Sequence, residues 1–235
     1  MSLDTVDLGD LAFSSYVYCG LTKFDRTYRK LVEAVGGKLL LSDPVHSAAL
    51  LKWLNEWGCR QFSVNQHADT SKLLLAWGTD FSSHLPSPGE RLDALDDEAL
   101  GRTADAYEAL RSLTASIRED DVRMTVGPTG AGKILFALCP RQLPPWDDPI
   151  RTAMEWKGDR DSYLQYLRVV QSTIRRLHLQ LSSAGLNEQS FFKLIGRPDV
   201  TMPKLIDEYM WMTVTRGFEP PPKTVLEHWI TWKPQ

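Results

Sequence analysis

The stretch that decides the fold of this chain is Thr125-Val-Gly-Pro-Thr-Gly-Ala-Gly-Lys-Ile-Leu-Phe-Ala-Leu-Cys-Pro-Arg-Gln-Leu-Pro-Pro-Trp-Asp-Asp-Pro-Ile-Arg151. The glycines of Gly130-Ala131-Gly132 predict a tight turn, because glycine adopts backbone angles that other residues avoid. The apolar run over residues 133–138 predicts a short, buried helix. A proline-rich loop follows, and Asp147 then stands at the start of a second helix. The stretch therefore predicts a turn, a helix, a rigid loop and an aspartate at a helix entrance.

One interpretation of this stretch is a phosphate-binding P-loop. Residues 127–133 fit the pattern G-x-x-x-x-G-K, but Ile134 stands where the motif needs Ser or Thr to hold magnesium. A P-loop also opens a long helix after a buried strand, whereas Pro140 ends this helix after about two turns. This interpretation requires a parallel sheet in which residues 122–126 form a central strand.

The second interpretation is a phosphate-binding hairpin followed by a loop that carries a catalytic aspartate. A turn at Gly130-Ala131-Gly132 would expose backbone N–H groups at a helix N-terminus, where the helix dipole favours anions. Asp148 directly precedes Pro149 and is the better formal cap of the following helix, which frees Asp147 for chemistry. The competing role for Asp147 is that of the helix cap itself.

This second pattern resembles the helix-hairpin-helix DNA glycosylase superfamily, which contains endonuclease III and the 8-oxoguanine glycosylases. Its members carry a hairpin G-x-G, an apolar helix and a P-x-D segment whose aspartate is catalytic. The matching residues here are Gly130, Gly132 and Pro145-Trp146-Asp147. Lyase members also have a lysine in the helix, normally two residues past the second glycine. Lys133 follows Gly132 directly, an offset that turns the side chain by roughly 100°.

The resemblance implies an all-α, glycosylase-like fold with two helical lobes around a cleft. It places one domain over residues 1–235, with possible lobes at 1–121 and 122–235. The implied partner is DNA, from which the enzyme would flip a damaged or modified base and cut its N-glycosidic bond, in repair or in defence against modified phage DNA. The implied site residues are Asp147 and Lys133 for catalysis, Gly130, Ala131, Gly132 and Arg151 for DNA contact, and Trp146, Asp207 and Trp211 for the base pocket.

Several of these residues have a structural alternative. Lys133 acts as an amine nucleophile only if it reaches the sugar, and otherwise contacts phosphate or lies on the surface. Trp146 can be a packing residue. Asp207 can be a buried acid that pairs with a nearby Arg or Lys. The whole chain can also be a non-catalytic helical protein that binds DNA or another partner.

Composition sets further limits. The 235 residues hold 43% hydrophobic side chains, and no apolar run of about 18 residues predicts a membrane span. Cys19, Cys59 and Cys139 are isolated, which predicts free thiols in a reducing cytoplasm, and neither a metal nor another cofactor is expected. The N-terminal acids argue against a signal peptide. We expect a cytoplasmic monomer.

Charge is unevenly distributed along the chain. Residues 1–121 hold 12 basic and 19 acidic side chains, for a net charge of −7. Residues 122–235 hold 15 basic and 11 acidic side chains, for a net charge of +4. The positive half contains the central stretch, as expected if that half meets phosphates, although chance variation on a solvated surface gives the same sums.

Hydrophobic periodicity predicts a mainly α protein of about nine or ten helices, because no segment alternates with period two for long. Asp43 or Ser42 can cap the third helix, and glycines end several others. Three consecutive prolines precede a tail with Trp229 and Trp232. The predicted helices cover residues 8–19, 24–35, 45–57, 66–82, 97–117, 133–138, 159–184, 190–195 and 202–214.

Overall fold

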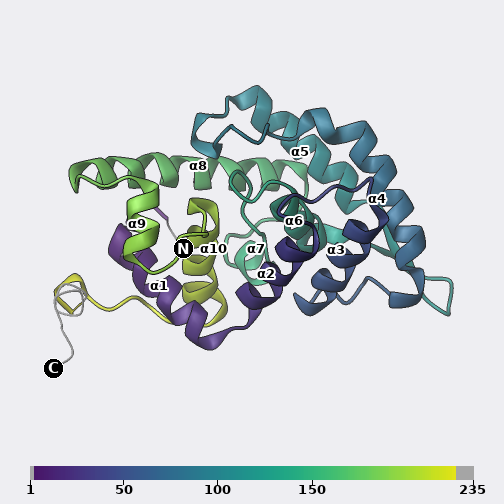
Figure 1. Cartoon of the computed structure of the whole chain (residues 1–235), viewed down its shortest axis with the longest axis horizontal. Helices are drawn as coiled ribbons and strands as arrows, with labels where there is room; N and C mark the ends of the chain where they lie inside the picture. Colours follow the sequence, from purple (N-terminus) through teal and green to yellow (C-terminus); the bar gives the residue numbers. More distant parts are fainter. Residues whose placement is uncertain (1–2, 226–235) are drawn as a thin grey trace.

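The computed structural model describes residues 3–225, so Trp229 and Trp232 lie outside the described residues. Over that range the chain is mainly helical, which confirms the predicted class (Figure 1). The helices are α1 (Leu8–Leu21), α2 (Phe24–Ala34), α3 (Pro44–Glu56), α4 (His67–Phe81), α5 (Asp97–Arg111), α6 (Gly127–Leu138), α7 (Asp148–Ala153), α8 (Arg160–Ser183), α9 (Glu188–Leu194) and α10 (Met202–Met210), which continues into a π-helical turn (Trp211–Thr215). The strands are β1 (Thr114–Ile117) and β2 (Arg123–Thr125).

The predicted helix ends follow local chemistry. The side chain of Asp43 accepts a hydrogen bond from the Val45 amide at 2.8 Å, and Pro44 begins α3. Gly58 follows α3 with a φ of +83°, which an L side chain rarely adopts. At α8, Asp159 caps the start and Gly185 follows the end with a φ of +68°. Capping residues and glycines therefore set these boundaries.

One predicted helix was too long. The range 97–117 was expected to be helical throughout, but α5 ends at Arg111 and residues 114–117 form β1. The strand is held by tertiary contacts, because Thr70 donates to the Ala115 carbonyl at 2.8 Å and Gln66 bonds both backbone groups of Ile117. Such contacts override local helix propensity.

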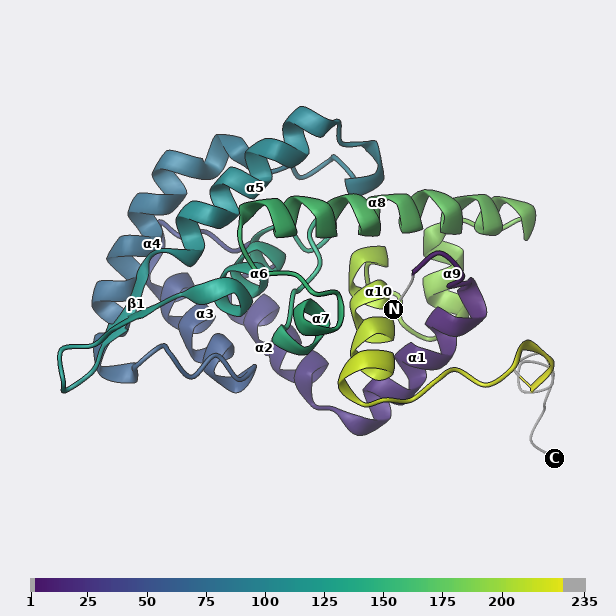
Figure 2. The ribbon, with the colours of Figure 1, turned by 180° about the vertical axis from the view of Figure 1, so that it is seen from behind.

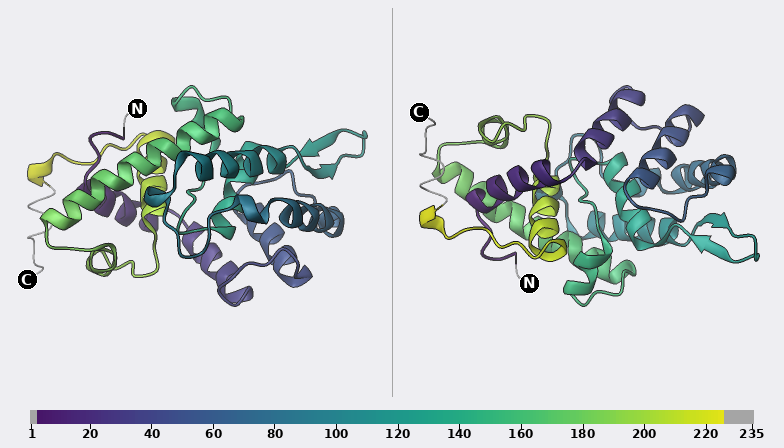
Figure 3. Two further views of the ribbon diagram at one scale, coloured as in Figure 1. Left: turned by 90° about the horizontal axis from the view of Figure 1, so that it is seen from above. Right: turned by 90° about the horizontal axis from the view of Figure 1, so that it is seen from below.

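The small sheet excludes the P-loop interpretation. Within residues 3–225 it consists of β1 and β2 alone, paired antiparallel as a hairpin. Residues 123–125 are therefore not a central parallel strand, and the hairpin protrudes from the helical body (Figure 3). Within residues 3–225, the segment 127–133 therefore does not follow a strand of a parallel sheet, as a P-loop does.

The long helix α8 organises the molecule (Figures 1 and 2). Its N-terminal part lies against α5, while α1, α9 and α10 gather beside its C-terminal part. Helix α1 packs on α10, although the two are far apart in the sequence. Helix α6 packs on α3 and α5. Contacts between α5 and α8 and between α1 and α10 therefore cross the boundary between residues 121 and 122. Among the described residues, no helix combines the length and hydrophobicity needed to cross a bilayer.

Candidate active site

The central glycines lie inside a helix. Helix α6 begins at Gly127, whose φ of +67° makes the turn after β2. Gly130, Ala131 and Gly132 are therefore helical and buried, so the prediction of an exposed phosphate-binding turn at these residues was wrong. The sequence pattern misled because Gly127 supplies the required backbone turn, whereas the other two glycines serve close packing.

Gly132 allows α6 to approach the proline-rich loop. A Cβ atom at this position would lie 3.0 Å from Trp146 Cβ and 3.2 Å from the Trp146 backbone nitrogen. Backbone atoms yield less easily than the tip of a flexible side chain, so a larger residue here would have to push the loop back by a few tenths of an ångström. The contact aligns the two following residues, Lys133 on α6 and Asp147 on the loop.

Two carbonyls fix the loop that carries Asp147. The Tyr166 hydroxyl of α8 donates to the Pro145 carbonyl at 2.8 Å, and the Arg151 guanidinium donates to the Trp146 carbonyl at 2.9 Å. The Trp146 ring is fully buried and stacks on Tyr166 with ring centroids 5.2 Å apart. The backbone before Asp147 is thus rigidly held.

These contacts correct two predicted roles. Trp146 is a core residue with no exposed surface, so it does not line an open base pocket in this structure. Arg151 is 6% exposed and bonds Trp146, Thr129 and Asp148, so it is not available for DNA contact. Its guanidinium instead forms internal hydrogen bonds that hold the loop before Asp147, because the donors of a buried arginine must find partners within the protein.

Asp147 occupies the N-cap position of α7 with an extended backbone (φ −90°, ψ 157°), but its side chain makes no capping hydrogen bond. Asp148, expected to be the cap, is instead the first helical residue and pairs with Arg151 at 2.8 Å. The Asp147 carboxylate turns to Lys133, with Oδ1 lying 2.8 Å from Nζ. The side chain of Asp147 is therefore free of the capping role, as predicted, although Asp148 does not replace it.

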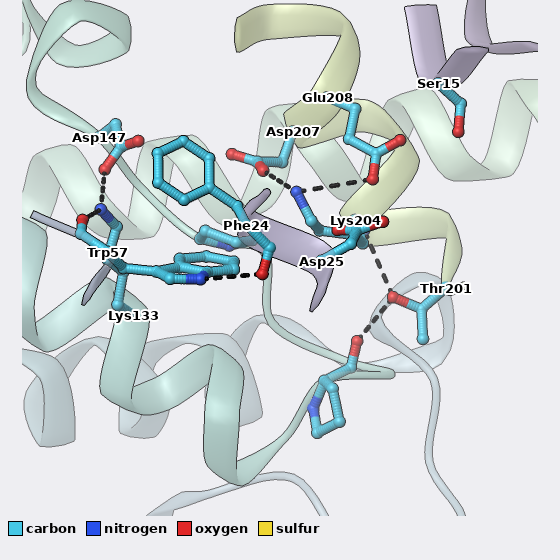
Figure 4. A network of polar contacts seen from close by, with 12 residues as sticks. Ser15, Phe24, Asp25, Trp57, Lys133, Asp147, Thr201, Lys204, Asp207 and Glu208 are labelled. Atoms are coloured by element: carbon cyan, nitrogen blue, oxygen red, sulfur yellow. Dashed lines mark hydrogen bonds and ion pairs between the residues drawn. The ribbon is translucent and has the colours of Figure 1, made fainter. Parts of the chain in front are cut away.

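Lys133 is the buried partner of this pair. Its Nζ donates to the Trp57 carbonyl at 2.8 Å and lies 5.6 Å from the centroid of the Trp57 indole (Figure 4). The Lys133 side chain is 7% exposed, whereas that of Asp147 is 26% exposed. The ammonium is thus enclosed, and the carboxylate forms the solvent side of the pair.

A second lysine–carboxylate group lies across Trp57. Lys204 on α10 contacts Asp207 at 2.8 Å and Glu208 at 3.6 Å, and its Nζ is also 5.6 Å from the Trp57 centroid. Asp207 is 4% exposed and Glu208 is fully buried. The alternative role for Asp207, a buried acid paired with a lysine, is the one that the structure shows.

The two groups interact electrostatically. Burial raises the pKa of Asp207, Lys204 opposes that rise and the negative charge of Asp147 adds to it, so that the pKa of Asp207 becomes about 6. Burial acts to lower the pKa of Lys204, but Asp207 and further neighbours outweigh it and hold this pKa well above its ordinary value. The surrounding carboxylates therefore favour the protonated form of Lys204, and burial favours the protonated form of Asp207.

Arg197 extends the network to the N-terminal helices. Its guanidinium contacts Glu208 at 3.0 Å, donates to Ser15 at 2.6 Å and pairs with Asp25. The guanidinium thereby neutralises carboxylates from α2 and α10 together, as buried ionic groups require. Trp211, the remaining predicted pocket residue, packs edge-on against Tyr18 with centroids 5.2 Å apart.

The sequence did not lead us to assign five residues to this site, namely Trp57, Lys204, Glu208, Arg197 and Asp25. A lysine with acids three and four residues later usually marks an exposed helix face. Helix α10 is amphipathic in sequence, with Lys204, Asp207 and Glu208 on one face, so the sequence offered no signal that this face is buried. Neither Lys133 nor Asp147 lines the surface hollows around Leu39 and Cys139 or the hollow beside Phe218.

Comparisons with protein-family models, with curated proteins and with solved structures found no match.

Proposed function

We propose that this chain is a DNA glycosylase that cleaves the N-glycosidic bond of a damaged or modified base, with Asp147 and Lys133 as its reacting groups. The observation that carries the proposal is the Lys133–Asp147 pair. An aspartate in the N-cap position forgoes its local hydrogen bond and meets, at 2.8 Å, a lysine that is fixed by the Trp57 carbonyl. Rigidly held side chains of this kind are typical of a preorganised site.

The chemistry follows from the charges. Loss of the base builds positive charge on the sugar, which a carboxylate at the position of Asp147 stabilises. If Lys133 attacks, its ammonium must first lose a proton, and the adjacent Asp147 carboxylate would accept it. The neutral amine would then form a bond to C1′ of the sugar as the C1′–N bond breaks, and the base would leave with the bonding electrons and take up the proton from Asp147, which restores the negative carboxylate. If water attacks instead, the product is an abasic site.

Borohydride trapping tests the role of Lys133. Wild-type protein is incubated with duplexes carrying oxidised purines and then with phage DNA carrying modified cytosines, and released base is detected by mass. Covalent trapping in wild type, lost in Lys133→Met, assigns the amine as nucleophile. Base release without trapping assigns the attack to water. The matched control is Asp148→Asn, which alters the adjacent, more exposed carboxylate and should leave release unchanged.

One observation favours a second candidate, a non-catalytic helical protein that binds DNA or another partner. The Lys133 ammonium is enclosed, and neither member of the pair lines the surface hollows beside Leu39, Cys139 and Phe218. In that case the pair only ties α6 to the α7 loop. Absence of base release from every substrate, combined with unaltered DNA binding by Asp147→Asn, would support this candidate.

A further inference from the structure

Two adjoining surface hollows lie outside the Lys133–Asp147 pair. The first has a volume of about 340 Å³ and lies between the end of α2, residues 86–88 and the end of α6; we call it the Arg141 hollow. The second has a volume of about 230 Å³ and lies between residues 39–42 and α4; we call it the Leu75 hollow. Leu39 and Leu138 line both, so the hollows meet at these two side chains. Together they reach the size of a small-molecule site, about 300–1,000 Å³.

Charge is confined to one end of the joined hollows. Among the residues that line them, the charged side chains are Lys38 and Arg141, and both belong to the Arg141 hollow. No acid lines either hollow, although the chain holds 30 acidic against 27 basic side chains. Within residues 3–225, neither cation has an ion-pair partner. The lining is therefore positive at one end and uncharged along the rest.

The walls that carry the two cations are held in place. Gln142 is 3% exposed, and its Nε2 donates to the Glu90 carbonyl at 2.7 Å. This bond fastens the segment that carries Arg141 to the loop before α5. On the other wall, the Gly37 amide bonds the last turn of α2 at 2.8 Å, directly before Lys38. The Arg141 hollow is therefore pre-formed, as ligand sites usually are.

The lining decides the class of ligand. Apolar side chains along both hollows favour a hydrocarbon chain, and Leu40 and Leu75 leave apolar surface exposed there. Two cations at one end favour an anionic head group. The hollow beside Phe218 is larger, about 850 Å³, and also mainly apolar, but Glu219 lines it and would repel an anion. Charge therefore distinguishes the joined hollows from the larger one.

We propose that the joined hollows bind a single-chain alkyl carboxylate, with its carboxylate at Lys38 and Arg141 and its chain passing Leu138 into the Leu75 hollow. The ligand is bound and released without covalent change. The inference is independent of the proposed function, because it involves neither member of the Lys133–Asp147 pair.

Calorimetry with decanoate, below the concentration at which it forms micelles, measures the binding. Octanoate and acetate shorten the chain, and decanol keeps the chain without the charge. Lys38→Gln/Arg141→Gln removes both cations. Its matched control is Lys52→Gln/Lys193→Gln, which changes the net charge equally at exposed lysines outside both hollows. Vesicles of anionic phospholipid test a membrane surface as the alternative source of an anionic head and an alkyl chain.

We expect decanoate to bind wild type and the control variant equally. It should bind about tenfold more tightly than octanoate, because each buried methylene strengthens binding about fourfold, and acetate should not bind detectably. Lys38→Gln/Arg141→Gln should lose about tenfold or more in decanoate affinity and nothing in decanol affinity, as loss of charged contacts does. Equal affinity of wild type for decanol and decanoate, undiminished decanoate affinity in the double variant, or binding to vesicles without binding to free decanoate would each overturn the proposal.

Thiol labelling locates the ligand without any substitution. The free thiol of Cys139 lines the Arg141 hollow, whereas that of Cys19 lines the hollow beside Phe218. Burial raises the pKa of Cys139 to about 12, so its labelling by N-ethylmaleimide should be slow and easily timed by peptide mass spectrometry. Decanoate should slow the labelling of Cys139 several-fold and leave that of Cys19 unchanged. Labelling of Cys139 that saturating decanoate does not slow would overturn the proposal.

Discussion

Gly132 of α6 touches Trp146 of the loop before α7, and this contact sets Lys133 beside Asp147. A Cβ atom at Gly132 would approach Trp146 Cβ to 3.0 Å and the Trp146 nitrogen to 3.2 Å. Lys133 directly follows Gly132, and Asp147 directly follows Trp146. The geometry of the site therefore depends on how closely two backbones approach, which the absence of a side chain at Gly132 favours.

Gly132→Ala should move the pair apart. Overpacking of a buried contact costs about 1–3 kcal/mol, so the free energy of unfolding should fall by that amount, and base release should fall with it. Chemical denaturation measures the first effect. The control is Gly101→Ala on α5, where a Cβ would meet its nearest atom, on Arg160, at an ordinary 3.9 Å, so that stability should stay equal or rise. Equal stability of Gly132→Ala and wild type would contradict the close contact.

The ion pair should respond asymmetrically to loss of either partner. Asp147→Ala leaves the ammonium of Lys133 buried without its counter-ion, and removal of one partner from a buried pair costs about 3–5 kcal/mol. Lys133→Met leaves a carboxylate that is 26% exposed and can be hydrated, so its cost should be smaller. Urea denaturation of both single variants and the double variant gives the coupling. A larger loss in Lys133→Met would show that the enclosed member has been misassigned.

Removal of the side-chain hydroxyl should lower the free energy of unfolding at Tyr166 but not at Tyr163. Tyr166→Phe removes the donor to the Pro145 carbonyl and leaves that buried acceptor unpaired, at a cost of about 1–3 kcal/mol. Tyr163→Phe is the matched control, because its buried hydroxyl has no hydrogen-bond partner among residues 3–225. Its removal should be neutral or stabilising. Thermal or chemical unfolding of both variants measures the contrast, and equal losses would count against the anchoring of the Asp147 loop.

Asp207 should make stability depend on pH. Its pKa rises from an ordinary 3.8 to about 6, so the folded protein holds this proton more tightly than the unfolded chain. The resulting stabilisation is complete below the unfolded value and is lost as the pH rises through about 6. Asp207→Asn should lack this dependence between those two pH values. Carbon NMR of the Asp207 carboxyl measures the midpoint directly, and a midpoint near 4 would contradict the strong burial of this group.

The predicted helices were largely confirmed because caps, prolines and glycines act locally. Asp43 and Pro44 begin α3, and Gly185 ends α8, as their types require. The errors arose where distant residues decide. Thr70 and Gln66 form hydrogen bonds with residues 115 and 117, which lie in a strand where the sequence predicted the end of a helix. No local sequence pattern predicts these contacts.

The site was predictable in part. Asp147 was singled out because it precedes a helix after a rigid loop, and the structure places its carboxylate outside the capping role. Its pairing with Lys133 could not be derived, because the position of the ammonium depends on the Trp57 carbonyl, 76 residues away in the sequence. The burial of Lys204 and Asp207 likewise depends on a distant segment, because α1 packs on α10.

The proposed function requires the Asp147 carboxylate to stabilise positive charge on a sugar during base release. Asp147→Asn keeps the size and much of the hydrogen bonding of this side chain while removing its charge. The decisive measurement is the single-turnover rate of base release by wild type and Asp147→Asn, with DNA affinity measured in parallel. We expect unchanged DNA binding and a rate reduced by about 10²–10³, as for loss of one aligned electrostatic partner. A folded Asp147→Asn variant that releases base at the wild-type rate would contradict it.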